Sequence, residues 1–75
     1  MKKILNVGCG NQVYGTERID IVKTPATTRI HDLEKRFPYP DNTFDEVYSQ
    51  YVFEHMKNPY SLLLEMNRVC KKGGV

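Results

Sequence analysis

Apolar and polar positions along the chain follow two patterns, one typical of strands and one typical of a helix. Four short apolar runs, rich in β-branched residues and separated by glycine, proline or polar residues, predict four strands. Their expected ranges are 3–7, 17–22, 27–31 and 44–49. Residues 38–42, which read Pro-Tyr-Pro-Asp-Asn, exclude helix and favour a turn. A short helical turn is expected over residues 51–56.

The clearest expected element is a helix in the last part of the sequence. Asn58 is a suitable N-cap, and Pro59 suits the first helical position, where its missing N–H costs no hydrogen bond. Lys71 and Lys72 suit the negative end of the helix dipole, and Gly73 is expected to supply a left-handed cap. An apolar stripe at helical spacing is expected to pack against the sheet, and it consists of Leu62, Leu63, Met66, Val69 and Cys70.

Candidate chemistry begins where the first apolar run stops. Gly8 and Gly10 flank Cys9 directly after that run, and Asp20 stands towards the end of the second run. In a parallel sheet these residues lie at the carboxyl ends of neighbouring strands. Glycines let the backbone approach a ligand closely, and a carboxylate can accept hydrogen bonds from a ribose diol. The pattern therefore predicts a cofactor that contains a nucleoside.

The spacing around these residues disfavours a nicotinamide dinucleotide. A dinucleotide-binding unit needs about 20 residues between its glycines and its acidic residue, because a full helix intervenes. Between Gly10 and Asp20 there is room only for a loop or a single helical turn. Val13 also occupies the place of the third glycine of that fingerprint.

Composition limits the number of domains, the class of protein and the expected compartment. The 75 residues suffice for one small domain, and 40% hydrophobic with 27% charged residues is typical of a globular sequence. The net charge of +2 comes with scattered lysines, so no basic stripe predicts nucleic-acid binding. Two cysteines argue against a disulfide framework, and no run is long enough for a signal peptide or a membrane span. We expect a cytoplasmic protein.

Further motifs follow the glycine turn in a fixed order. After Ile-Leu-Asn-Val-Gly-Cys-Gly-Asn at 4–11 and Asp20 come His-Asp-Leu-Glu at 31–34, Pro-Tyr-Pro-Asp-Asn-Thr-Phe-Asp-Glu-Val at 38–47, Val-Phe-Glu-His at 52–55 and Glu-Met-Asn-Arg-Val-Cys-Lys-Lys-Gly-Gly at 65–74. Together they resemble the class I S-adenosylmethionine-dependent methyltransferases, most closely the methyltransferase type 11 group. The resemblance covers essentially the whole chain. It implies an α/β fold with a Rossmann-like partial parallel sheet, strands one to four of a class I methyltransferase core, and flanking helices.

The resemblance implies a role for the glycine turn and for the end of the second strand. Gly8, Cys9 and Gly10 would form the turn under the methionine part of S-adenosyl-L-methionine. Asp20 would accept hydrogen bonds from the ribose hydroxyls, and Ile21 would pack against the adenine.

The later motifs complete the implied cofactor site. Asp32 would accept a hydrogen bond from the adenine amine, and Leu33 would close the other adenine face. Ser49 and Gln50, just past the fourth strand, would border the methionine end. The implied chemistry is methyl transfer to an O, N or C nucleophile, with S-adenosyl-L-homocysteine as the product. The sequence identifies no acceptor.

The chain departs from the family pattern at several positions. Asn6 stands where many members have an acidic residue, and Asn11 and Gln12 replace the usual glycine-containing pair. The first helix is nearly absent, and the sequence ends at Val75, where the fifth strand of the family would begin. Residues 1–75 are therefore expected to form the cofactor-binding part of a single domain that lacks its carboxyl-terminal strands. An exposed edge on the fourth strand would favour self-association.

Several candidate residues have a second interpretation. Cys9 is expected to be a small residue tolerated between glycines rather than a nucleophile, and Cys70 is expected in the core. Asp32 could cap the turn that follows it. His55 is the weak catalytic candidate, as a general base beside Glu54, but the favoured interpretation is that the pair holds a short helix against the sheet. No metal-ligand spacing accompanies the histidines, so no metal site is predicted.

Two alternatives to a complete enzyme stay open. The polypeptide could be a truncated or non-catalytic module that binds S-adenosylmethionine or S-adenosylhomocysteine. It could also be a fragment with weak affinity for either molecule.

Overall fold

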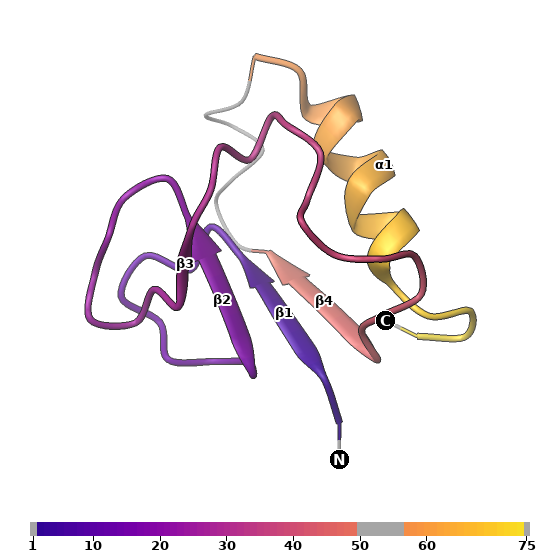
Figure 1. Cartoon of the computed structure of the whole chain (residues 1–75), viewed down its shortest axis with the longest axis horizontal. Helices are drawn as coiled ribbons and strands as arrows, with labels where there is room; N and C mark the ends of the chain where they lie inside the picture. The colour runs from indigo at the N-terminus through magenta and orange to yellow at the C-terminus, as the bar shows by residue number, and fades with distance from the viewer. Residues whose placement is uncertain (1, 50–56, 75) are drawn as a thin grey trace.

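The computed structural model describes residues 2–49 and 57–74, and it has an open sheet with one helix packed on it (Figure 1). The elements are β1 (Ile4–Val7), β2 (Glu17–Asp20), β3 (Arg29–Ile30), β4 (Glu46–Ser49) and α1 (Pro59–Val69). The four expected strands and the expected helix are therefore confirmed, each over a shorter range than predicted. The expected helical turn at 51–56 lies outside the described residues.

All strand pairs in the sheet are parallel, and the strand order is β3-β2-β1-β4. β1 lies between β2 and β4, with Leu5 opposite Glu17 on one side and opposite Val47 on the other. Chain order runs outward from β1 to β3 and then returns to the other side of β1 for β4. The order therefore reverses between β1 and β4, which is where open α/β sheets bind ligands at the carboxyl ends of their strands. This arrangement confirms the partial parallel sheet.

The hydrophobic core lies between α1 and one face of the sheet. Because side chains alternate along a strand, Leu5 and Val7 point to the same face, and the register brings Ile19 beside Val7. Leu62 and Val69 of α1 are fully buried against this face. The complete cluster contains Leu5, Val7, Ile19, Leu33, Phe37, Phe44, Leu62 and Val69.

The opposite face of the sheet is covered by the loop that joins β1 to β2. The Asn6 side-chain amide donates to the Tyr14 carbonyl at 3.1 Å, and Arg18 donates to the Gly15 carbonyl at 2.8 Å. The Tyr14 ring also meets the Tyr48 ring of β4 edge-on, with 5.0 Å between centroids. No helix intervenes between β1 and β2, as the short spacing predicted.

The start of α1 agrees with its sequence signals, whereas its end does not. Asn58 is the N-cap, and its side-chain oxygen accepts from the Ser61 N–H at 3.3 Å. The helix ends at Val69, and Cys70 is extended because it pairs with Phe44 in an isolated parallel bridge. Gly73 has the positive φ expected of a cap, but it lies in a later turn, so its predicted role was wrong.

The apolar stripe of α1 is narrower than predicted. Leu62 is fully buried, but Leu63 is 52% exposed and faces away from the core. Successive helical residues differ by about 100° in direction, and here Leu62 points at the sheet while Leu63 lies outside the buried stripe. Cys70, expected in the core, is only partly buried.

The predicted turn at 38–42 is confirmed, and Arg68 binds it to α1. Asn42 has a φ of +55°, and its N–H donates to the Arg68 carbonyl at 2.9 Å. The Arg68 guanidinium donates to the Phe37 and Tyr39 carbonyls and to Asp41. It also pairs with Glu65 at 2.8 Å. Within the part of the chain that the structure describes, no helix has the length and apolar character needed to span a membrane.

Candidate functional site

The glycine turn after β1 is fixed to the end of β2 by backbone hydrogen bonds. The N–H groups of Gly8 and Cys9 both donate to the Ile19 carbonyl, at 2.8 and 3.2 Å. Gly8 and Gly10 have φ values of +72° and +56°, in the left-handed region that side chains disfavour. The backbone path itself therefore favours glycine at both positions.

Asp20 joins this turn to the loop after β2. One carboxylate oxygen accepts from the Gly10 N–H at 2.7 Å, and the other accepts from the Val22 N–H at 3.1 Å. Each carboxylate oxygen has a second acceptor site, so the half-buried group can also receive hydroxyl donors. The turn and the carboxylate that the sequence singled out are thus in direct contact.

Open space lies beside Gly10. A Cβ built on this residue would meet no atom within 4 Å. The backbone at this position therefore faces a space that a ligand can approach, next to the Asp20 carboxylate.

The predicted adenine contacts differ in exposure. Ile21 is 64% exposed, so it offers an apolar surface one residue beyond Asp20. Asp32 is exposed, and its carboxylate accepts from the Glu34 N–H at 3.0 Å, which is the turn-capping arrangement considered above. Leu33 belongs to the hydrophobic core, with 8% exposure. The binding roles of these three residues stay predictions.

Two buried polar atoms on β1 and β4 find no hydrogen-bond partner among the described residues. They are Asn6 Oδ1 and Ser49 Oγ. Ser49 lies opposite Val7, directly before the glycine turn, and Asn6 is the fully buried residue that replaces the usual acidic one. Buried polar atoms are normally paired, so these two atoms are exceptions among the described residues. Gln50, predicted beside Ser49, lies outside the described residues.

Tyr14 anchors the loop that follows the glycine turn. Its hydroxyl donates to the Glu46 carboxylate of β4. This bond, with a smaller contribution from desolvation, raises the pKa of Tyr14 above its ordinary value. The loop is thereby held against β4 as well as against β1.

The reactive residue types do not form a catalytic group in the described part of the chain. Cys9 is buried, and its sulfur lies 3.6 Å from the Gly10 carbonyl and 3.7 Å from the Thr27 hydroxyl. The His31 ring packs edge-on against Phe37 with 6.0 Å between centroids. Glu54 and His55 lie outside the described residues, so the general-base hypothesis stays a prediction. Among described residues, no three His, Cys, Asp or Glu side chains are grouped to hold a metal ion.

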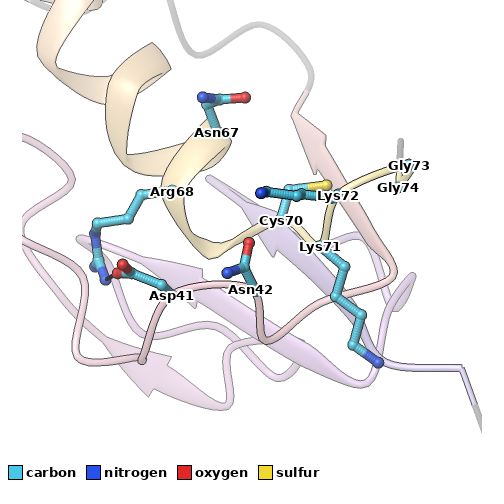
Figure 2. Close-up of a pocket in the computed structure, with 9 residues that line it drawn as sticks. All are labelled: Asp41, Asn42, Asn67, Arg68, Cys70, Lys71, Lys72, Gly73 and Gly74. Carbon is cyan, nitrogen blue, oxygen red and sulfur yellow. Dashed lines mark hydrogen bonds and ion pairs between the residues drawn. The ribbon is translucent and has the colours of Figure 1, made fainter.

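A separate pocket lies at the other end of the strands (Figure 2). It has a volume of about 370 Å³ and lies where α1 ends beside the segment that precedes β4. Two of its cations have acidic partners, because Arg68 pairs with Asp41 and Lys71 pairs with Asp45. Its position separates it from the glycine turn, which follows the carboxyl end of β1. Its lining residues are Asp41, Asn42, Asn67, Arg68, Cys70, Lys71, Lys72, Gly73 and Gly74.

One contact of the glycine turn was missed by the sequence reasoning. The Thr24 hydroxyl donates to the Gly10 carbonyl at 2.5 Å. The only sequence signal is a threonine-rich loop after the second strand, which is common in turns and names no partner.

Comparison with known proteins identifies relatives of this chain. A family model described as a methyltransferase domain matches residues 16–75. The chain is 46% identical over 39 residues to an uncharacterized methyltransferase, C1B3.06c, of Schizosaccharomyces pombe. That match covers 52% of this chain and 14% of the yeast protein.

A solved structure has the same fold. It comes from a complex between the Haloferax volcanii Trm112 methyltransferase activator and a protein described as a methyltransferase. The match covers 97% of this chain with a TM-score of 0.74 and 20% sequence identity, and it covers 42% of the other chain. The chain thus spans less than half the length of either of these two relatives.

Proposed function

This chain belongs to the methyltransferase domain family, and from that premise we propose that it binds S-adenosyl-L-methionine at the carboxyl ends of its parallel strands. The observation that carries the proposal is the 2.7 Å hydrogen bond from the Gly10 N–H to Asp20. It joins a glycine turn that leaves open space for a ligand to a carboxylate that can still accept hydroxyl donors.

In this proposal, different residues of the chain contact different parts of the cofactor. Gly8, Cys9 and Gly10 would hold its methionine part, and Asp20 would accept from its ribose hydroxyls. Exposed Ile21 would pack against the adenine. The Ser49 hydroxyl, which has no hydrogen-bond partner among the described residues, lies opposite Val7 and would supply a polar contact near the turn, which fits a cofactor with an amino-acid end.

When bound, S-adenosyl-L-methionine supplies a methyl group on a positively charged sulfur, where an O, N or C nucleophile can attack it. The chain contributes by fixing the orientation of the cofactor, because alignment of the reacting groups accounts for much of such catalysis. Methyl transfer is our proposal for a chain as long as those of the relatives. For residues 1–75 we propose cofactor binding alone.

The proposal predicts how two aspartates differ. Isothermal titration calorimetry should detect binding of S-adenosyl-L-methionine and S-adenosyl-L-homocysteine to the unmodified chain. Asp20→Asn should weaken both affinities about tenfold or more, because the side chain loses its charge and one of its two acceptor oxygens.

The matched control is Asp45→Asn. Asp45 also accepts a backbone N–H, from Lys3 at 2.7 Å, but it precedes β4 and so lies at the opposite end of the strands. This variant should keep the affinity of the unmodified chain. Absence of heat with both ligands would contradict the proposal, and equal losses in the two variants would remove Asp20 from the site.

A further inference from the structure

Both backbone polar groups of Gly10, its N–H and its carbonyl, make hydrogen bonds with side chains. Its N–H donates to Asp20 at 2.7 Å, and its carbonyl accepts from the Thr24 hydroxyl at 2.5 Å. Glycine has no side chain to restrict its backbone, so the orientation of these groups depends on such contacts. Two separate parts of the chain therefore set the direction of the turn, the end of β2 and the loop that follows it.

In this fold no helix shares that task. A helix that opens directly after a glycine turn holds the following peptide groups in its own hydrogen-bond ladder. Here residues 11–16 form a loop, and the backbone bond that follows the turn is the one from the Gln12 N–H to the Cys9 carbonyl at 2.9 Å. The Gly10 carbonyl instead accepts from side chains, from the Thr24 hydroxyl at 2.5 Å and from the weaker Cys9 thiol donor at 3.6 Å.

Thr24 is itself rigidly placed. Its hydroxyl accepts from the Ala26 N–H at 3.1 Å, and its own N–H donates to the Thr27 hydroxyl at 3.1 Å. The Thr27 N–H closes the turn by donating to the Thr24 carbonyl at 3.0 Å. Pro25 fixes a backbone angle within the same turn.

The Thr24 and Thr27 hydroxyls each have a single proton to donate. The Thr24 proton lies on the bond to the Gly10 carbonyl, and the Thr27 proton lies on the 3.1 Å bond to the Val22 carbonyl. The 3.1 Å approach between the two hydroxyl oxygens therefore adds no further hydrogen bond. The Thr27 hydroxyl also lies 3.7 Å from the Cys9 sulfur. The two threonines thus connect the loop to the glycine turn at two points.

We propose that Thr24 is a positioning residue for cofactor binding, which acts by fixing the Gly10 carbonyl and with it the glycine turn. The inference rests on the proposed function, because the turn matters to affinity only if a cofactor binds there. Thr24 itself makes no contact with the cofactor in this proposal. Its contribution is to remove conformations of the turn that the ligand would otherwise have to exclude on binding.

The test compares three threonine variants. Thr24→Val removes the hydroxyl at nearly constant volume, and Thr24→Ser keeps it. Thr43→Val is the matched control, because the Thr43 hydroxyl also donates to a backbone carbonyl, that of Pro40 at 2.7 Å, in the turn before β4. Urea unfolding verifies that each variant folds, and Thr24→Ala replaces Thr24→Val should the added methyl group prevent folding.

Two readouts separate positioning from general stability. In calorimetry with S-adenosyl-L-homocysteine, Thr24→Val should raise Kd about three- to tenfold, as expected for one lost hydrogen bond. Thr24→Ser should restore Kd to within about twofold, and Thr43→Val should leave it unchanged. In the ligand-free chain, Thr24→Val should speed amide hydrogen exchange of Gly10 and Asn11, whereas Thr43→Val should not.

The outcomes also distinguish the inference from the proposed function. If the unmodified chain binds neither cofactor nor product, the proposed function fails, and amide exchange alone decides whether Thr24 orders the turn. Unchanged exchange at Gly10 in Thr24→Val overturns the inference in either case. An unchanged Kd in a chain that binds the ligand overturns it too, as does an equal rise in Kd in Thr43→Val.

Discussion

Gly10 combines a constrained backbone with an open environment. Its φ of +56° places it in the left-handed region, and a Cβ at this position would meet no protein atom within 4 Å. A side chain here would therefore act in two ways, through backbone strain and through the space that it takes from a ligand. Alanine separates these effects better than valine, because branching at Cβ adds further strain where φ is positive.

Gly73 provides a control that separates backbone strain at Gly10 from loss of ligand space. It has a φ of +82°, it also has open space around its Cβ position, and it lies in the turn after α1. Gly10→Ala and Gly73→Ala should each cost roughly 1 kcal/mol of unfolding free energy in urea titrations. Only Gly10→Ala should weaken S-adenosyl-L-homocysteine binding, by about tenfold or more. Equal affinities in the two variants would mean that no ligand occupies the space beside Gly10.

The start of α1 is determined by local sequence, whereas its end is determined by a distant contact. Asn58 and Pro59 act on neighbouring backbone groups, so the start of the helix could be predicted from sequence. Its end depends on Cys70 pairing with Phe44, a residue 26 positions earlier, and no local signal reports that contact. The predicted cap at Gly73 was wrong for this reason.

The same distinction applies to the candidate site. The glycine turn and Asp20 could be predicted because parallel strands place their carboxyl ends together. Thr24 could not, because its partner lies 14 residues away and loop threonines serve many local purposes. Neither could the core position of Leu33, which depends on how residues 31–37 fold back onto the sheet.

Leu62 and Leu63 test how α1 contributes to stability. Leu62→Ala should lower the free energy of unfolding by about 2 to 5 kcal/mol, because it leaves a cavity in the core. For a domain of this size, with total stability on the order of 5 kcal/mol, that change should visibly populate the unfolded state. Leu63→Ala, at a 52% exposed position, should change it by less than about 0.5 kcal/mol. Urea titrations followed by circular dichroism measure both, and similar losses would show that the two leucines are buried alike.

For the molecule as a whole, the two edges of the described sheet are unequal. The edge at β3 is formed by a strand of only two residues, whereas β4 has four. Longer unpaired strands are better templates for pairing with another chain. Self-association of the 75-residue chain, which we predicted from the sequence, should therefore involve β4.

Sedimentation velocity over a wide range of protein concentration should show association that increases with concentration. Under the same conditions, amide hydrogen exchange of β4 should slow as concentration rises. The amides of α1, already bonded within the helix, serve as the internal reference. A single monomeric species at every concentration, or equal slowing in α1 and β4, would argue against edge pairing.

The central place of β1 also affects the order in which this protein can assemble. Its partners are β2, about a dozen residues later, and β4, about forty residues later, since Leu5 faces both Glu17 and Val47. The first pairing closes a short loop, while the second must wait for a distant segment and carries a larger entropic cost. During folding, the side of β1 that will receive β4 therefore stays open longest, at the strand that leads directly into the glycine turn.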